Sequence, residues 1–305
     1  MAIVLGPNQY GKAEVRVVAV DRSESSHELV DLNVSSALRG DFAAAHTAGD
    51  NAHVLTTDAQ KNTVFAFARD GVGSPEAFAL RLARHFAGAY DWITGARVAV
   101  DSSGWDRIVV GGQPHEHAFR RDGGEVRTAV VTVDGDGPDA GTHVLAGIGD
   151  LVVLQSTGSE FWGFPRDRYT TLAETDDRIL ATAVTARWRY TGTDVDWEAG
   201  YAAVRTTLLE TFAGTHSQAL QQTLYAMGEA ALEQHGHVAE IRFSMPNKHH
   251  FLQDLSAYGL DNALDAPGAV VYHADDRPYG LIEGTVLRDD VPAAPAAWLG
   301  TPGFC

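Results

Sequence analysis

The sequence has almost no cysteine and no long apolar run. Its single cysteine, Cys305, is the last of 305 residues, which excludes intramolecular disulfides, thiolate metal sites and an embedded cysteine nucleophile. Residues 1–10 lack the basic region and the long apolar stretch of a signal peptide. No segment reaches the roughly 18 to 20 apolar residues that a membrane-spanning helix needs. We therefore expect a cytoplasmic protein in a reducing compartment.

Basic residues are also scarce. The chain has 23 Lys and Arg against 40 Asp and Glu, a formal net charge of -17. Such a surface repels phosphate backbones and anionic lipids, and no Lys/Arg-rich stretch offsets the charge locally. We therefore expect neither a nucleic-acid partner nor a membrane partner, and a few focused cations must bind any anionic substrate. Apolar residues make up 45% of the chain, which is enough for a globular core.

The motifs of common metal and nucleotide sites are missing from the sequence. The acidic turn at residues 134–139 lacks the Gly and Glu positions of an EF-hand loop. Two histidine pairs, His115/His117 and His235/His237, have no nearby Cys or carboxylate at a known zinc spacing. We interpret both pairs as structural, and a zinc or copper site is the alternative. No Walker loop and no nucleophile elbow occurs.

Hydrophobic patterns follow the same order in the two halves of the chain. Residues 1–140 contain an alternating hairpin, two amphipathic helices and further strands, and residues 141–288 repeat that order. The hairpins and helix pairs are segregated, which predicts an α+β fold with two tandem antiparallel ββααββ units. The tail, residues 289–305, is expected to be irregular surface chain.

The predicted elements have identifiable limits. Ser74 is the expected N-cap of a helix with Pro75 at its first position, and Ser217 is the expected N-cap of the last long helix. The predicted strands are residues 13–20, 27–34, 96–100, 106–111, 128–133, 150–154, 179–190, 238–244, 270–273 and 281–287, and the other predicted helices are residues 58–70 and 197–212.

Short segments spread along the chain resemble one enzyme family. They are Tyr10-Gly-Lys12, Thr57-Asp-Ala-Gln-Lys-Asn62, Glu160-Phe-Trp-Gly-Phe164 with the following Arg166–Leu172, and Ser244-Met-Pro-Asn-Lys-His249. In this order, and from about residue 8 to residue 288, they are similar to urate oxidase (uricase) of the actinobacterial type. The resemblance implies a tunnelling fold (T-fold), in which subunits assemble into a β-barrel tunnel and two barrels stack as a homotetramer.

The resemblance also implies a reaction. Urate would be oxidised by O2 and water to 5-hydroxyisourate and hydrogen peroxide, without a metal or an organic cofactor. An electron-rich purine anion can itself reduce O2, so the protein must hold the anion, deprotonate it further and place O2 over the ring. Two alternatives remain: a zinc-free T-fold protein that binds a purine or pterin without turnover, and a relative of the cyclohydrolases or pterin synthases, which hold zinc through His and Cys.

The resemblance assigns substrate binding to a set of polar and apolar residues. Arg178 would hold one edge of urate through two parallel hydrogen bonds, and the Gln221 amide would offer a donor and an acceptor to the other edge. Phe161 would stack on the purine face. Without the resemblance, an ion pair with Asp176 or Asp177 is the preferred interpretation of Arg178. The full set is Thr57, Asp58, Phe161, Leu172, Arg178, Leu220, Gln221, Asn247 and Ile282.

Lys12, Thr57 and His249 correspond to the proton relay of the family. A lysine can act as a base where its surroundings disfavour the charged form, and a threonine hydroxyl bonded to it can pass a proton to or from a water above the ring. Asn247 would hold that water or O2 together with Thr57. Without the resemblance, Lys12 is a polar residue at a strand edge and His249 is a loop histidine.

The resemblance further implies that each site is shared between subunits. Lys12, Thr57 and Asp58 would come from one subunit, and Arg178 and Gln221 from its neighbour. Open sheet edges in each subunit also need pairing, so a lone subunit is expected to be poorly stable.

Overall fold

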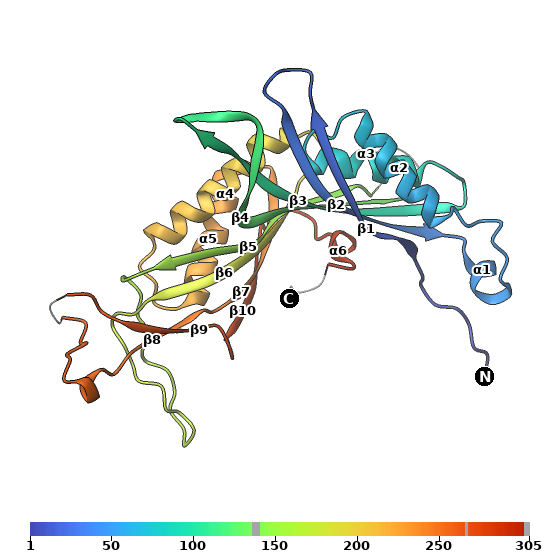
Figure 1. The fold of residues 1–305 in the computed structure, drawn as a ribbon. Helices are drawn as coiled ribbons and strands as arrows, with labels where there is room; N and C mark the ends of the chain where they lie inside the picture. Colours follow the sequence, from blue (N-terminus) through green and yellow to red (C-terminus); the bar gives the residue numbers. More distant parts are fainter. Residues whose placement is uncertain (136–140, 266–267, 302–305) are drawn as a thin grey trace.

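A computed structural model describes residues 1–135, 141–265 and 268–301. Its centre is one eight-stranded antiparallel sheet in the order β1-β2-β3-β4-β5-β6-β7-β10 (Figure 1). A separate two-stranded sheet pairs β8 with β9. The predicted α+β fold with two tandem antiparallel units is confirmed.

The first unit contains the predicted hairpin and helix pair. The side chain of Ser74 accepts a hydrogen bond from the backbone of Ala77, and Pro75 takes the first helical position as expected. The elements of the unit are β1 (Tyr10–Asp21), β2 (Glu28–Gly40), α1 (Ala43–Ala48), α2 (Thr57–Arg69), α3 (Pro75–Ala87), β3 (Ile93–Val110) and β4 (Gln113–Asp134).

The second unit repeats the arrangement and adds two features. They are an arm, residues 156–179, between β5 and β6, and a small sheet before β10. Its elements are β5 (His143–Gln155), β6 (Leu180–Tyr190), α4 (Trp197–Gly214), α5 (Leu220–Gln234), β7 (Val238–Pro246), β8 (His249–Leu252), η1 (Ser256–Tyr258), β9 (Tyr272–Asp275) and β10 (Leu281–Leu287). The tail adds the short helix α6 (Pro295–Trp298).

One predicted break between strands is wrong. Residues 96–100 and 106–111 were expected as separate strands, but both lie in β3. The register against β4 shifts between Ser103 and Trp105. A bulge interrupts the alternation of side chains without ending the strand, and this explains the misleading pattern.

The predicted start of the last long helix is also wrong. The helix α5 begins at Leu220, and its N-cap, Ala219, has no side-chain hydrogen bond. Ser217 is fully buried and pairs with Ser159 in a parallel β-bridge. Ser217, which local capping rules assign to the start of the helix, therefore takes part in a contact with a distant segment of the chain instead.

Both helix pairs cover the same face of the sheet (Figure 1). α2 packs on β1, α3 on β3 and β4, and α5 on β7 and β10. The core between the layers contains large, fully buried side chains such as Phe78, Phe86, Trp188 and Phe243. None of the helices in the described part of the chain is long and apolar enough to cross a membrane.

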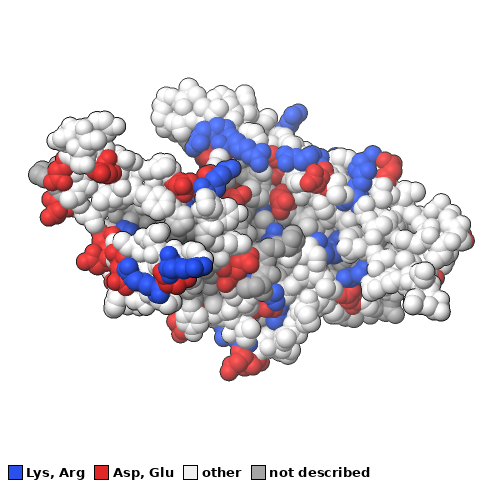
Figure 2. Space-filling model, turned by 90° about the horizontal axis from the view of Figure 1, so that it is seen from below, with Lys and Arg blue, Asp and Glu red and all other residues white. Residues whose placement is uncertain are grey.

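The opposite face of the sheet carries charged side chains and part of the tail. Seen from below, basic and acidic side chains lie interspersed across this face (Figure 2). The tail was expected to be irregular, but α6 packs here: Ala297 and Trp298 contact Val130 and Leu145. The Trp298 indole donates to a Glu240 oxygen at 3.0 Å. These contacts stabilise α6 and explain why this short segment, rich in proline and alanine, is helical.

Candidate active site

Five of the residues predicted from the sequence line one cavity in the second unit. They are Phe161, Leu172, Arg178, Asn247 and His249. The cavity has a volume of about 520 Å³, which lies in the range of small-molecule sites. The arm before β6, the end of β7 and the β8-β9 sheet supply its walls. The structure therefore brings together the predicted stacking ring, the predicted anion-binding cation, the asparagine predicted to hold water or O2 and the histidine predicted for the proton relay.

The arm between β5 and β6 is held by hydrogen bonds between its own two sides. Phe161 and Thr175 exchange backbone hydrogen bonds of 2.8 and 3.1 Å, and the Arg178 backbone N–H donates to the Ser159 carbonyl at 2.8 Å. This ladder places the Arg178 guanidinium carbon 5.1 Å from the centroid of the Phe161 ring. A cation and an aromatic face therefore lie side by side at the cavity.

Arg178 is not the ion-pair partner of its acidic neighbours. Its Nε donates to Ser159 Oγ at 3.3 Å, and its terminal nitrogens have no hydrogen-bond partner among the described residues. Asp177 instead accepts from Thr157 Oγ1 and from the backbone of Gly158. Burial lowers the pKa of Arg178 below its usual value, but the group remains cationic. A desolvated guanidinium with unused donors is suited to bind a planar anion.

Asn247 and His249 are positioned by the chain that leaves β7. The Asn247 backbone N–H donates to the Gly280 carbonyl at 2.8 Å. His249 opens β8 opposite Asp275, and its ring lies 5.6 Å from that of Phe251. Both side chains are half-buried, so they face the cavity and remain accessible to a ligand.

Leu220, Gln221 and Ile282 lie outside the lining of this cavity. Leu220 is buried at the first position of α5, and Gln221 is exposed beside it. Ile282 is opposite Met245 in the β7–β10 pair and packs against the core. Within one chain these three residues therefore belong to the start of α5 and to the sheet edge beside it, and not to the cavity wall.

The first unit holds the other predicted relay residues. Lys12 lies on β1 opposite Ser36, and Thr57 is the first residue of α2; both are half-buried. Asp58 is exposed and accepts a hydrogen bond from Lys61 Nζ at 2.6 Å. This hydrogen bond lowers the pKa of Asp58, and the charge of Lys12 contributes to the same shift. Lys12 and the start of α2 are therefore neighbours.

The two groups of residues do not meet within one chain. β1 and β10 are the opposite edges of the sheet. Figure 1 shows α2 beside β1 at one end of the molecule and the β8-β9 sheet at the other. Every residue that lines the cavity belongs to the second unit. Within one chain, the cavity therefore brings together only part of the predicted set.

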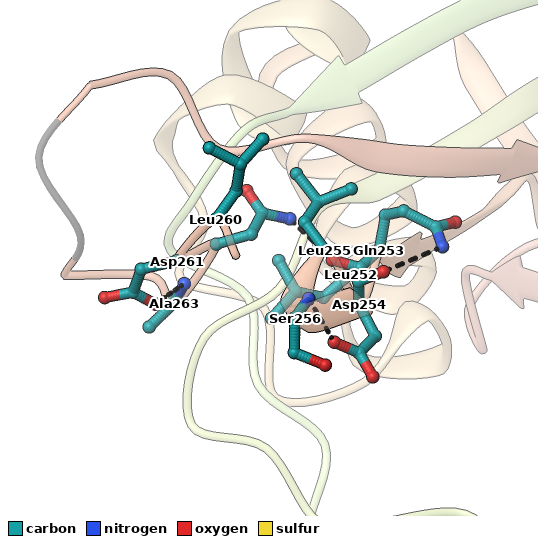
Figure 3. A pocket seen from close by; sticks show the side chains of 9 residues that line it. Leu252, Gln253, Asp254, Leu255, Ser256, Leu260, Asp261 and Ala263 are labelled. Atoms are coloured by element: carbon teal, nitrogen blue, oxygen red, sulfur yellow. Dashed lines mark hydrogen bonds between the residues drawn. The ribbon is translucent and has the colours of Figure 1, made fainter. Parts of the chain in front are cut away.

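A second, smaller cavity of about 300 Å³ lies in the loop between β8 and β9 (Figure 3). The polar groups around this cavity form hydrogen bonds with other residues of the same loop. Asp254 accepts from the Ser256 backbone, Asp261 accepts from the Ala263 backbone, and the Asn262 amide donates to two backbone carbonyls. Since these groups stabilise turns, we interpret this cavity as a structural feature of the loop.

The histidine pairs do not form part of a metal centre in the described residues. No group of three or more His, Cys, Asp or Glu side chains is arranged there to hold a metal ion. The rings of His115 and His117 lie 4.6 Å apart in an edge-on arrangement, and His235 Nε2 lies 2.9 Å from Thr207 Oγ1. Cys305 is outside the described residues.

Several residues of the cavity carry no sequence motif. Phe251, Leu264 and Tyr272 line it, and they reach it only because β8 and β9 form a sheet beside the arm. Ser159, which holds Arg178, was likewise not indicated by any pattern. Only the pairing of distant segments reveals these residues.

The architecture identifies the class of protein. An antiparallel sheet of two ββααββ units, with both helix pairs on one face, is the tunnelling fold. A family model for uricase matches residues 8–132 and 144–283. The chain belongs to the uricase family, as the resemblance of its sequence segments predicted.

Individual relatives agree with this assignment. Uricase from Arthrobacter globiformis is 57% identical over 99% of this chain and 96% of the relative. Uricase from Dictyostelium discoideum is 35% identical over 92% of this chain and 96% of the relative. The crystal structure of the Arthrobacter globiformis uricase covers 96% of this chain and 98% of that chain, with a TM-score of 0.89 and 58% identity. A Bacillus fastidious uricase structure gives a TM-score of 0.77 at 25% identity, over 92% and 93% of the two chains.

Proposed function

We propose that the protein oxidises urate with O2 and water to 5-hydroxyisourate and hydrogen peroxide, without a metal or an organic cofactor. The observation that carries the proposal is the cavity of the second unit, where a guanidinium with no ion-pair partner among the described residues lies beside an aromatic face. In a chain with a net charge of -17, such a focused cation is suited to a planar anion. Family membership supports the choice of urate.

In the proposed mechanism the substrate supplies the electrons. Arg178 and Gln221 hold opposite edges of the urate anion, and Phe161 stacks on its face. Lys12, through Thr57, removes a further proton, and the resulting dianion gives two electrons to O2. One proton taken from urate and one from the attacking water complete hydrogen peroxide, and the remaining hydroxide of that water bonds to C5 of the oxidised ring.

The remaining proposed residues position the small reactants and close the site. Asn247 and Thr57 hold the O2 or water above the ring, and His249 takes part in the proton relay. Asp58 binds substrate through its backbone. Leu172, Leu220 and Ile282 form apolar walls that exclude bulk water.

We propose that two copies of the chain build each site. The junction of β4 and β5 inside the chain supports this arrangement. There, Arg127 bonds Glu76, the second residue of α3, at 2.7 Å and Glu198, the second residue of α4, at 2.6 Å. If β10 of one copy pairs with β1 of another in the same way, the start of α5 meets the start of α2. Gln221 and Asp58 are the second residues of those helices, so they would become neighbours.

The pairing of β10 with β1 would close two subunits into a barrel, and we propose that two barrels form a homotetramer. The unpaired strand edges at β1 and β10 support closure. Native mass spectrometry tests the number of subunits. A stable, active monomer would contradict both the tetramer and the shared site.

A direct assay tests the reaction. Protein treated exhaustively with a chelator is mixed with urate in air, and the loss of urate absorbance is followed together with peroxide. We expect one peroxide per urate and no dependence on added metal. Loss of turnover on chelation that one metal restores would contradict the cofactor-free mechanism, and binding without peroxide would indicate a urate-binding protein.

A further inference from the structure

Three buried hydroxyl side chains connect the arm to the start of α5. Ser159, Ser217 and Thr223 are each 0% exposed. Thr223 Oγ1 donates to Ser217 Oγ at 2.7 Å, and Ser159 Oγ accepts from Arg178 Nε at 3.3 Å. A buried hydroxyl costs free energy unless it is hydrogen-bonded, so these contacts fix the side chains in place.

Ser159 joins segments that each lead to a substrate-binding residue. Its carbonyl accepts from the backbone of Arg178 at 2.8 Å, and two residues further along its own segment is Phe161. Its parallel bridge with Ser217 continues as a 2.8 Å hydrogen bond from the Glu160 backbone to the Ser217 carbonyl. Ser217 lies just before the start of α5. The backbone of Ser159 is therefore held from both sides.

The side chain of Ser159 acts on one atom of the arginine. An arginine has several rotatable bonds, and its guanidinium must be held in one plane to bind a planar anion through parallel hydrogen bonds. The contact at Nε leaves the terminal nitrogens unused, and Arg178 lines the cavity. Arg178 has no other side-chain hydrogen bond among the described residues, so Ser159 alone orients the guanidinium by hydrogen bonding.

We propose that Ser159 is a positioning residue for substrate: its fully buried hydroxyl holds Arg178 Nε so that the terminal nitrogens face the urate anion. This inference rests on the proposed function, since it assigns Ser159 to the same site. Ser159 acts through Arg178 and does not itself touch the substrate. Its loss should therefore weaken binding of urate and leave the chemical step unchanged.

The test compares Ser159→Ala with a control in the same arm. Thr157→Val removes a hydroxyl that bonds Asp177 and keeps the side-chain volume. We expect Ser159→Ala to raise the KM for urate about tenfold, as the loss of a hydrogen bond to a charged group should, with kcat within about twofold of wild type. Thr157→Val should leave both constants unchanged, although both variants lose a hydrogen bond of the arm.

A double-mutant cycle separates positioning from general damage to the arm. In an Arg178→Met background there is no Nε to hold, so adding Ser159→Ala should not lower kcat/KM further. The same loss in both backgrounds, or an unchanged KM in Ser159→Ala, would overturn the proposal. If Ser159→Ala does not fold, Ser159→Cys replaces it in the same comparison, with the same overturning results.

The wild-type assay distinguishes a failure of the proposed function from a failure of the proposed role of Ser159. A wild-type protein without peroxide production from urate would overturn the proposed function. In that case, equilibrium binding of xanthine, a related purine anion, still tests the role of Ser159, because Ser159→Ala should weaken it about tenfold. Normal wild-type turnover with an unaffected Ser159→Ala variant would overturn the role of Ser159 alone.

Discussion

The first strands of the two units, β1 and β5, have the same local geometry. Each has a glycine followed three residues later by a residue with positive φ: Gly11 precedes Glu14 at 56°, and Gly147 precedes Asp150 at 57°. Both strands shift register at this bulge. A Cβ on either glycine would lie 1.8 or 2.5 Å from a carbonyl of the neighbouring strand. The repeat therefore extends to the level of single backbone conformations.

The side chains at this shared bulge are different. In the first unit, the residue two positions before Glu14 is Lys12, which is half-buried. In the second unit, the residue two positions before Asp150 is Ile148, which is fully buried. β5 pairs with strands on both sides, whereas β1 is the edge of the sheet. The same backbone feature is thus accompanied by a core residue inside the sheet and by the proposed relay amine at its edge.

The helix starts show the same contrast. At the internal junction, Glu76 is fully buried against Arg127, and desolvation raises the pKa of its carboxyl. At the open edge, the corresponding residue, Gln221, is exposed and neutral. Charged side chains close the junction within the chain, whereas at the open edge the neutral Gln221 takes the position of Glu76. This is the edge where we propose that a second copy and the substrate meet it.

The strongest test of this contrast is complementation. Arg178→Ala and Thr57→Ala are each expected to show little turnover at a urate concentration near the wild-type KM, yet co-expression should restore activity. A mixed dimer has one site with both lesions and one with neither, so random mixing gives about a quarter of wild-type activity. The readout is urate turnover by mixed oligomers confirmed by mass spectrometry.

A matched pair provides the control for complementation. Arg178→Ala mixed with Phe161→Ala should remain inactive, because the two residues lie 5.1 Å apart in one chain and every mixed site keeps one lesion. Restoration in this control, or no restoration with Thr57→Ala, would refute the shared site.

The next test concerns the shared bulge. Lys12→Met should lower kcat by about 10²- to 10⁴-fold, because a positioned base contributes that much to proton transfer. Ile148→Met, at the corresponding position of β5, should keep kcat and change the free energy of unfolding by less than about 1.5 kcal/mol. Steady-state kinetics on both variants decides the matter: a Lys12→Met variant with normal kcat and a raised KM would exclude the relay role.

Two arginines allow a comparison between the β4–β5 junction inside the chain and the open edges of the sheet. Arg178→Ala should cost about 2 to 4 kcal/mol of urate binding with little change in the thermal midpoint. Arg127→Ala leaves Glu76 buried without its partner and should cost about 3 to 5 kcal/mol of folding stability. Kinetics and thermal unfolding of both variants check this division, and equal effects on stability would contradict it.

Much of the fold could be predicted because local patterns agree with it. Buried and more exposed residues alternate along much of β1 and β2, and Ser74 caps α3 through the nearby backbone of Ala77. Ser217 misled the prediction because its burial depends on Ser159, which lies far away in the sequence. Local rules cannot include such a pairing.

The candidate site could be predicted only where it carries a motif. Arg178 and Phe161 were recovered through the resemblance, and the structure then brought them together. The opposite wall, with Phe251 and Tyr272, has no motif and depends on the β8-β9 pairing. The proposed division of the site between two chains was implied by the resemblance, and the comparison of the internal junction with the open edges supports it.

The smallest expected effect concerns the turns that follow the second helix of each unit. After α5 the chain carries His235 and His237, with rings 5.8 Å apart, whereas the turn after α3 carries the stacked aromatic pair Tyr90 and Trp92. Burial lowers the pKa of both histidines from 6.5, and for His235 the neighbouring His237 lowers it further. A lowered histidine pKa means that the unfolded chain binds more protons than the folded chain at mildly acid pH. The free energy of unfolding therefore falls as the pH drops below about 6.5.

Replacing both histidines by glutamine should reduce this acid sensitivity. Because both rings are only partly buried, we expect the difference between wild type and the double variant to be below about 1 kcal/mol. Denaturant unfolding at pH 7.5 and pH 5.5 measures it: the wild type should lose more stability on acidification than the variant. Equal losses would show that the turn after α5 is as insensitive to pH as we expect the turn after α3 to be. The contrast between the two units would then be confined to the sheet edges and helix starts where the shared site is proposed.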